Sequence, residues 1–198
     1  VQYSLSTPFD ISTATRTFVD GAGTKLTCST AMKLPHAIEF KPDGTRMFIT
    51  TNKDHGAGNP GVAVYQFKLT TAWDTSTLDC EEIFEVDITG DIPFEDQVRT
   101  LTFKPDGTRM FVGGMTRDRI REYILTTPFD LRSGVSVGSL SASLASSSDT
   151  SMRNIQLHSD GTILYVAGDD NNNMHKYTLS TPWDITTISS TSTEYDLG

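Results

Sequence analysis

The sequence has few positively charged residues and lacks any long apolar run. Of its 198 residues, 16 are Lys or Arg and 25 are Asp or Glu, so the formal net charge at pH 7 is −9. Proteins that bind nucleic acid through its phosphates concentrate Lys and Arg, and this acidic balance argues against such a partner. No stretch of about 18 apolar residues occurs, so the sequence predicts no transmembrane helix.

Cysteine is scarce, and the signatures of several enzyme classes are missing. The two cysteines, Cys28 and Cys80, sit at non-equivalent places of the repeat described below, which favours two unpaired thiols over a disulfide without excluding the disulfide. The sequence contains no G-x-S-x-G, H-E-x-x-H or C-x-x-C motif and no phosphate-binding glycine loop. Its first residues, V-Q-Y-S-L-S-T-P, include neither an initiator Met nor a signal segment, so we expect that processing or truncation removed what preceded them.

The sequence does contain two phrases that alternate along the chain. The first is F-K-P-D-G-T-R-M-F-I at Phe40–Ile49, which returns as F-K-P-D-G-T-R-M-F-V at Phe103–Val112 and more loosely as L-H-S-D-G-T-I-L-Y-V at Leu157–Val166. The second runs from a leucine to a Phe/Trp-Asp pair at Leu5–Asp10, Leu69–Asp74, Leu125–Asp130 and Leu179–Asp184. Recurrence at a period of about 55 residues indicates a protein built from one repeated supersecondary unit.

Each repeat has the pattern of four short β-strands. Short apolar or alternating segments such as Pro35–Phe40, Arg46–Thr50 and Val62–Leu69 are separated by turn residues, and no window shows a 3.6-residue apolar period. The sequence therefore predicts an all-β fold, with a half-unit and connector at 1–33 and four-stranded units at 34–90, 91–146 and 147–198. The fourth strands of the last two units are predicted at Gly138–Ala145 and Ile188–Asp196.

Four-stranded meanders that repeat in this way are typical of β-propeller blades. The F-x-P-D-G-T-x-M-F-V and L-S-T-P-W-D-I-S-T phrases resemble those of a β-propeller repeat family of bacteria and their phages, often marine, whose members mostly have no assigned function. The resemblance covers nearly the whole chain and implies a disc of about seven blades, of which this chain supplies about three and a half. We therefore expect a fragment of a longer propeller, or, less favoured, a second chain as the protein partner that completes the disc.

Seven aspartates occupy equivalent turn positions: Asp43, Asp106, Asp160, Asp10, Asp74, Asp130 and Asp184. We predict that they hold the turns by accepting hydrogen bonds from local N–H groups, while glycine supplies a positive φ and the aromatic residue of the second phrase packs between blades. Trp73 and Trp183 take the places of Phe9 and Phe129, which favours packing over stacking on sugars. Calcium ligation is the weaker alternative, because the D-x-D-x-D-G spacing is missing. No cofactor is otherwise predicted.

Candidate binding residues lie at the opposite end of the units, in loops that do not repeat. Three positions align at the start of the first strand of each unit, and they hold His36, Arg99 and Arg153. Variable loops on a fixed scaffold commonly carry binding sites. We therefore predict a polar ligand-binding face formed by His36, Arg99, Arg153, Asn52, Asp54, His55, Arg117, Asp118, Asp169 and Asp170. The alternative is a set of solvated loop tips around an occluded channel.

These patterns favour a non-enzymatic binding or interaction module, exposed as a structural or adhesion protein on a phage virion or outside a bacterial cell. A glycan-binding lectin is an alternative, although the loops differ too much to form equivalent pockets between blades. A metal-dependent hydrolase or lactonase is less favoured, because its metal would need acidic ligands where the aligned positions offer His and Arg. Metal binding at His175, beside the Asp169–Asn173 run, is weaker still, and no metal site is predicted.

Overall fold

The computed structural model describes the chain except for residues 1, 19–32, 55–59, 89–96, 145–150 and 169–171. The described residues form β-strands and three short 3-10 turns, and they include no α-helix. None of their helical segments is long and apolar enough to cross a membrane. The strands make one two-stranded sheet and three four-stranded sheets, in which every pairing is antiparallel.

Each four-stranded sheet is a meander whose strands pair in chain order, and we call each sheet a blade. The half-blade contains β1 (Gln2–Leu5), η1 (Ile11–Thr13) and β2 (Ala14–Phe18). Blade 1 contains β3 (Lys33–Phe40), β4 (Arg46–Asp54), β5 (Pro60–Leu69), η2 (Thr75–Thr77) and β6 (Leu78–Asp87). Blade 2 contains β7 (Val98–Phe103), β8 (Arg109–Gly114), β9 (Arg119–Thr127) and β10 (Asp130–Leu140). Blade 3 contains β11 (Met152–Leu157), β12 (Ile163–Gly168), β13 (Asn173–Thr178), η3 (Ile185–Thr187) and β14 (Thr193–Asp196).

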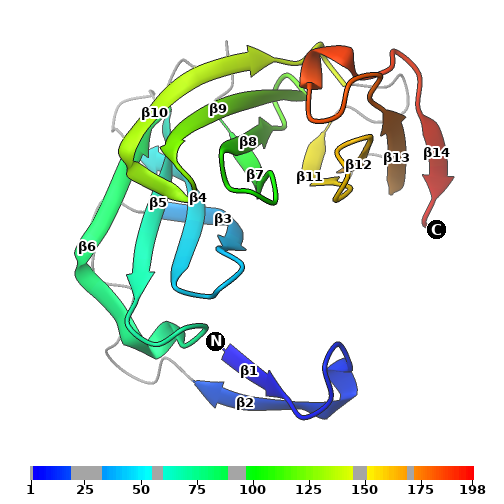
Figure 1. Ribbon diagram of the computed structural model, residues 1–198. Helices are drawn as coiled ribbons and strands as arrows, with labels where there is room; N and C mark the ends of the chain where they lie inside the picture. Colours follow the sequence, from blue (N-terminus) through cyan, green and yellow to red (C-terminus); the bar gives the residue numbers. More distant parts are fainter. Residues whose placement is uncertain (1, 19–32, 55–59, 89–96, 145–150, 169–171) are drawn as a thin grey trace.

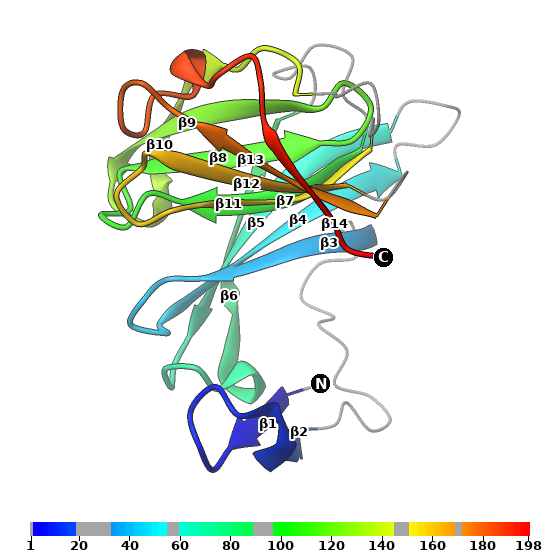
Figure 2. The same ribbon diagram turned by 90° about the vertical axis from the view of Figure 1, so that its right-hand side faces the viewer.

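The sheets stand in an arc around an open centre (Figure 1). The first strands of the blades, β3, β7 and β11, face this centre, and the last strands, β6, β10 and β14, form the outer rim. From the side, the turns that join β3 to β4, β7 to β8 and β11 to β12 lie at one end of the blades (Figure 2). This is the arrangement of a β-propeller, and the all-β chain forms a partial one, as predicted.

Two outer strands begin at places that the sequence did not predict. β10 begins directly after the second-phrase turn rather than at Gly138. β14 begins at Thr193 rather than at Ile188, because Ile188 forms only an isolated bridge to Leu179. An outer strand is paired on one side only, so fewer contacts specify where it starts.

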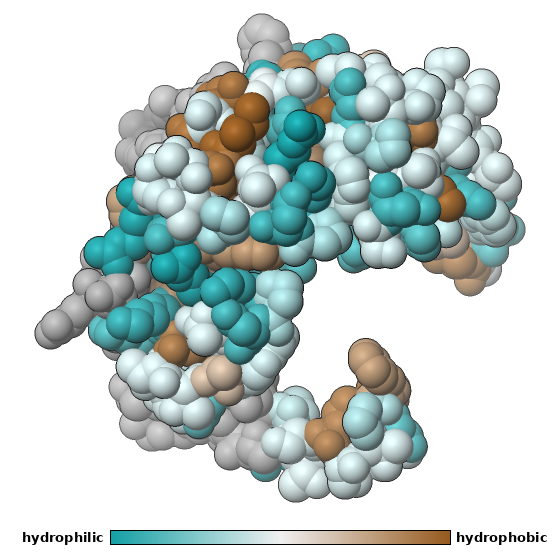
Figure 3. Space-filling model, viewed as in Figure 1, coloured by the Kyte–Doolittle hydropathy of each residue, from teal (hydrophilic) through white to brown (hydrophobic). Residues whose placement is uncertain are grey.

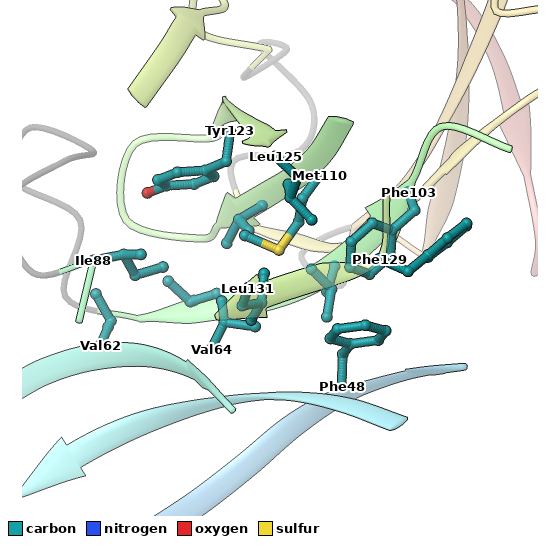
Figure 4. Packing of buried hydrophobic residues seen from close by; sticks show 13 residues of the cluster. Phe48, Val62, Val64, Ile88, Phe103, Met110, Tyr123, Leu125, Phe129 and Leu131 are labelled. Carbon is teal, nitrogen blue, oxygen red and sulfur yellow. The ribbon is translucent and has the colours of Figure 1, made fainter. Parts of the chain in front are cut away.

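The largest buried cluster fills the space between blades 1 and 2 (Figure 4). It combines Phe48 and Val64 of blade 1 with Phe103 and Met110 of blade 2, and the rings of Phe48 and Phe103 are 4.6 Å apart. A second cluster begins at Phe111 on the other face of blade 2 and continues into blade 3. Burial of each large apolar side chain contributes about 1.5–3 kcal/mol. The blades are therefore stabilised mainly against one another, because one sheet alone cannot cover its own faces.

The two repeated phrases meet within each blade. Gly107 has a φ of 72°, a value that glycine adopts without strain, and a Cβ there would lie 2.0 Å from the Phe129 ring. The Phe129 N–H also donates to the Gly107 carbonyl oxygen at 3.0 Å. The sequence placed these aromatic residues between blades, and Trp183 does reach Phe111 of the preceding blade, with 6.3 Å between the ring centroids. The structure adds that each ring of the three complete blades covers the turn of its own blade.

All seven turn aspartates accept hydrogen bonds from their own turns, as predicted. Asp106 Oδ1 accepts from the Thr108 N–H at 2.9 Å and from the Thr108 hydroxyl at 2.6 Å. Asp43 and Asp160 do the same with the threonine two residues further on. The four aspartates of the second phrase accept from the backbone N–H two residues further on: Asp10, Asp74, Asp130 and Asp184. These carboxylates therefore stabilise the turns.

An arginine that follows the D-G-T turn ties one blade to the next. Arg46 of β4 donates to the Phe129 carbonyl oxygen at 2.6 Å and to Asp130 Oδ2 at 3.1 Å. Arg109, at the equivalent position of β8, donates to the Trp183 carbonyl oxygen at 3.4 Å. The repeated phrase thus sets the contact between blades as well as the turn within each blade.

Candidate functional site

The first strands of the three blades bring His36, Arg99 and Arg153 together at the inner wall of the arc. Arg99 Nη1 lies 2.6 Å from His36 Nδ1 and 2.8 Å from His36 Nε2. Arg99 Nε and Arg153 Nη1 each lie 3.2 Å from Sδ of Met115, which follows β8. Arg99 Nη2 also donates to the side-chain oxygen of Gln97. We call these five residues the cation cluster.

β-Bulges place these side chains. In β7, Val98 and Thr100 pair with consecutive residues of β8, so Arg99 is an extra residue between them. Arg153 is the extra residue of β11 in the same way, and His36 lies within a register shift of β3. A bulge interrupts the alternation of a strand and re-aims a side chain, and bulges are over-represented beside binding and active sites. The alignment of the three positions was visible in the sequence, whereas the bulges were not.

Hydrogen bonds next to the cation cluster join the strands that carry its two arginines. Thr100 Oγ1 donates to Asn154 Oδ1 and accepts from the Ile155 N–H, both at 3.1 Å. Thr100 is fully buried, while Asn154 is exposed. The link holds together the strands β7 and β11 at the residues that directly follow Arg99 and Arg153.

The cation cluster borders the hollow at the centre of the arc. His36, Arg99 and Arg153 are half-buried, and the space-filling surface remains hollowed beside the inner strands (Figure 3). The strands that carry the cluster, β3, β7 and β11, face this hollow (Figure 1).

The two arginines also act on His36 through their charge. Partial burial, and then the positive charges of Arg99 and Arg153, lower the pKa of His36 below its ordinary value of 6.5. The neutral imidazole can accept a hydrogen bond from Arg99, while the imidazolium would place a like charge in contact with it. The cluster is thus a local concentration of positive charge on a chain whose net charge is −9.

Three other predicted binding residues, Asn52, Asp118 and Arg117, lie outside the cation cluster. Asn52 is only 7% exposed, and its Oδ1 has no hydrogen-bond partner within the described part of the chain. Asp118 is 5% exposed, its Oδ1 accepts from the Met152 N–H at 2.7 Å, and its carbonyl oxygen accepts from the Leu144 N–H at 2.7 Å. The structure gives Asp118 a role in joining blade 2 to blade 3, where the sequence placed it on an open face. Arg117 is exposed, as expected of a loop residue.

The remaining predicted residues are the side chain of Asp54 together with His55, Asp169 and Asp170, and they lie outside the described part of the chain. The side chains of Cys28 and Cys80 do so as well. In contrast, Gln97 and Met115 belong to the site without having been predicted. Their closeness along the chain to β7 and to the end of β8 was the only signal, because neither occupies a repeated position.

Metal-binding geometry is absent from the residues that the structure describes. No three His, Cys, Asp or Glu side chains among them form a group that would hold a metal ion. The turn aspartates are engaged with their own turns, as described above. His175 is 3% exposed and its Nδ1 lies 3.2 Å from Ser192 Oγ, so it packs within blade 3.

Comparisons with known proteins bear on the fold. No family profile and no curated protein matches the sequence. Among solved structures, the chain is similar to a functionally unknown protein from Desulfotomaculum acetoxidans, with 17% identity and a TM-score of 0.51 over 82% of this chain and 43% of that one. It is similar to a Bacteroides fragilis protein provisionally assigned as a 6-phosphogluconolactonase, with 14% identity and a TM-score of 0.50 over 83% and 42%. It is also similar to hydrazine synthase from Kuenenia stuttgartiensis, with 11% identity and a TM-score of 0.52 over 76% and 46%.

The chain spans less than half the length of each of these three structures. At such low identity, similarity reports the path of the backbone and carries no information about the residues of a site. The neighbours accordingly differ in what they are described to do. By its fold, this chain is a partial β-propeller.

Proposed function

We propose that the chain is a non-enzymatic binding module, exposed as a structural or adhesion protein on a phage virion or a bacterial exterior, and that it binds its ligand at the cation cluster. The observation that carries the proposal is the convergence of His36, Arg99 and Arg153, from three different blades, beside the central hollow. Convergent polar groups on a concave surface are the usual composition of a binding site.

The chemistry of the cation cluster suits binding better than catalysis. Guanidinium and amide groups orient a ligand, but they do not act as nucleophiles at neutral pH. His36 is the one member able to transfer a proton near neutral pH, and its contact within the cluster is with the cationic Arg99. A general base needs a reacting group within reach, whereas this arrangement offers donors for a ligand to accept.

The exterior location rests on the sequence. The chain is acidic, with a net charge of −9, and rich in Ser and Thr. Its two repeated phrases resemble those of a propeller family of bacteria and phages. Both features suit a surface-exposed module that meets other molecules through its loops.

Exposed apolar residues of the half-blade favour a further protein segment or partner that completes the disc. Phe9 is 98% exposed, while Phe129 at the equivalent place of blade 2 is 7% exposed. Leu5 and Leu125 differ in the same direction, with 39% and 4% exposed. In blade 2, Phe129 and Leu125 are buried by β7, β8 and the turn that joins these two strands, which have no counterpart in the half-blade. An equivalent pair of strands would bury Phe9 and Leu5, and would close an edge that is otherwise open to aggregation.

A glycan-binding lectin is the second candidate, because the cluster offers half-buried hydrogen-bond donors beside a hollow. A metal-dependent lactonase has less support. The similarity to the Bacteroides fragilis protein concerns the fold, and the residues that converge here from the inner strands are basic.

The test is binding of the purified, fluorescently labelled chain to a printed panel of neutral and acidic bacterial surface polysaccharides. The same panel is probed with the Arg99→Ala/Arg153→Ala double variant. We expect the wild-type chain to bind at least one polysaccharide, and the double variant to lose that binding while its thermal unfolding is unchanged. Equal binding by the double variant would contradict the location of the site, and a blank panel for the wild-type chain would contradict surface polysaccharides as the ligand.

A further inference from the structure

We infer that a cavity between the outer parts of blades 2 and 3 binds a neutral sugar, as the hexopyranose ring of a saccharide. The cavity has a volume of about 530 Å³, within the range of about 300–1,000 Å³ that small-molecule sites occupy. The inference goes beyond the proposed function, because the cavity shares no residue with the cation cluster.

An irregular segment of blade 3 forms one wall of the cavity. Four residues, 189–192, separate the isolated bridge at Ile188 from the start of β14 at Thr193. The β13 partners of these two positions are separated by only two residues, Tyr177 and Thr178. The segment 189–192 therefore has two more residues than the strand beside it, and it bulges away from that strand. We call it the outer bulge.

Hydrogen bonds hold the outer bulge in place. The Ser189 N–H donates to the Thr178 carbonyl oxygen at 2.8 Å, and Ser189 Oγ donates to the Thr191 carbonyl oxygen at 2.6 Å. At the other end, Ser192 Oγ lies 3.2 Å from Nδ1 of the buried His175. Both ends of the bulge are thus anchored to β13, so the wall is already formed in the free chain, as in most small-molecule sites.

Buried apolar side chains form the floor of the cavity. Leu144, Tyr177 and Ile185 line it and are 8%, 5% and 1% exposed. The Tyr177 hydroxyl donates to the Leu144 carbonyl oxygen at 2.9 Å, which joins blade 3 to blade 2 at this point. η3, which begins at Ile185, lies beside the end of β10 on the outer side of the arc (Figure 1). The floor therefore offers a fixed apolar surface to one face of a ligand.

Hydroxyl groups surround this floor. The residues that supply them are Ser143, Thr186, Ser189, Ser190, Thr191 and Ser192. The side chains of Ser190 and Thr191 are exposed, and neither makes a hydrogen bond to the described part of the chain. A serine or threonine hydroxyl both donates and accepts hydrogen bonds, as the hydroxyl groups of a sugar do.

The lining favours a neutral ligand with both polar and apolar surface. Among the described residues that line the cavity there is no Asp, Glu, Lys, Arg or His. A charged ligand would lose hydration there without gaining an ion pair. A purely apolar ligand would remove water from the hydroxyl groups without replacing its hydrogen bonds. A sugar ring fits both parts of the lining, because its C–H groups can contact the floor while its hydroxyl groups pair with those of the rim.

The experiment is an NMR titration of the whole chain with six monosaccharides. Four are neutral, namely glucose, galactose, mannose and N-acetylglucosamine, and two are charged, namely glucosamine and glucuronate. The same titrations are run on Arg99→Ala/Arg153→Ala, in which the cation cluster can no longer hold an acidic sugar. We expect at least one neutral sugar to bind both proteins with a dissociation constant in the millimolar range, equal to within about twofold. In the double variant, the charged sugars should bind at least about tenfold more weakly than that neutral sugar.

A pair of substitutions tests the rim of the cavity. Ser190→Ala/Thr191→Ala removes two hydroxyl groups and should weaken binding of the neutral sugar about tenfold, the effect expected from two lost hydrogen bonds. The matched control, Thr126→Ala/Ser136→Ala, removes the same two groups from exposed positions of β9 and β10 outside the cavity. Its affinity should stay within about twofold of wild type. Equal affinities of the two variants would overturn the location of the site.

A deletion tests the wall. Removal of Ser190 and Thr191 leaves two residues opposite Tyr177 and Thr178, so the outer strand can pair without a bulge. We expect binding of the neutral sugar to be lost while thermal unfolding stays cooperative. Unchanged binding by the folded deletion variant would overturn the inference, and the substitution pair decides the question if the deletion variant does not fold.

Failure of this inference is distinguishable from failure of the proposed function. The inference is wrong if none of the four neutral sugars binds, or if a charged sugar binds the Arg99→Ala/Arg153→Ala variant equally well. Polysaccharide binding that is lost in that variant and kept in Ser190→Ala/Thr191→Ala would support the cation cluster alone. The reverse result would support the cavity and contradict the cation cluster as the site.

Discussion

The two ends of the blades differ in what they repeat. At the turn end, which carries the D-G-T turns, every complete blade has a positive-φ glycine under an aromatic ring and an aspartate bound to its own threonine. At the cluster end, blade 1 offers His36 where blades 2 and 3 offer arginines, and Gln97 and Met115 occur once. Residues that recur in every unit serve the structure of the unit. Residues that differ from unit to unit are not required by the unit and can serve a ligand.

The largest effect on stability is expected at the turn end, from Gly107→Ala. A Cβ at this position would lie 2.0 Å from the Phe129 ring, and a φ of 72° is strained for alanine. We expect a loss of about 3 kcal/mol in the free energy of unfolding, from backbone strain and overpacking together. Denaturant unfolding measures it. In Gly107→Ala/Phe129→Ala the ring is gone, so the loss in the double variant should be smaller than the sum of the losses in the two single variants. A loss equal to that sum would contradict the steric explanation.

A smaller effect is expected where the turn end joins two blades. Arg46→Met keeps the aliphatic stem and removes the hydrogen bonds to the Phe129 carbonyl oxygen and to Asp130. We expect a loss of about 1.5–3 kcal/mol, because the lost bonds have a charged donor and are half-buried. The comparison variant is Arg132→Met on the exposed face of β10, which should stay within about 0.5 kcal/mol of wild type. Equal losses in the two variants would show that the hydrogen bonds between the blades do not contribute to the free energy of unfolding.

Acid should weaken the turn end by a still smaller amount. Hydrogen bonds from the Lys41 ammonium, and then from the Thr45 hydroxyl and N–H, lower the pKa of Asp43 from 3.8 to about 2. Burial raises the pKa of Asp106, but Lys104 and Thr108 outweigh it and hold that pKa at about 2 as well. Because the folded pKa values are depressed, these carboxylates stabilise the fold above about pH 4, and the stabilisation is lost as the pH falls towards 2.

The measurement is the thermal midpoint between about pH 5 and pH 2 for wild type and for Asp43→Asn/Asp106→Asn. Both carboxylates are about half exposed, so each should account for only a few tenths of a kcal/mol. The double variant should start lower and fall less steeply over this range. Parallel curves for the two proteins would mean that other carboxylates cause the acid sensitivity.

The smallest effect on stability is expected at the cluster end, from Arg153→Ala. Its side chain is half-buried at the inner wall of the arc, and we expect the free energy of unfolding to change by less than about 0.5 kcal/mol. Binding should change far more, as described above. A large loss of stability would contradict the distinction between the two ends, because it would give the cluster a structural role.

Much of the fold could be predicted because its determinants are local. The D-G-T turns, the alternating strands and the turn aspartates each depend on residues within about ten positions of one another, and all three recur. Starts of the outer strands were missed at Gly138 and Ile188, because a strand paired on one side leaves a weaker pattern.

The candidate site was less predictable because it is assembled across blades. Repetition aligned His36, Arg99 and Arg153, but it could not show that Met115 lies between two arginines from adjacent blades. Asp118 was predicted as a binding residue because it is a polar loop residue of variable sequence. Its burial against the start of β11 depends on how two blades pack, and no local pattern reports that packing.

The most direct test of the separation between the two ends is one affinity ratio. It compares wild type with Arg153→Ala for a polysaccharide of the panel that binds the wild-type chain. The account predicts a ratio of at least about ten in favour of wild type. A ratio near one would contradict it, because the arginines that converge from separate blades would then have no part in binding.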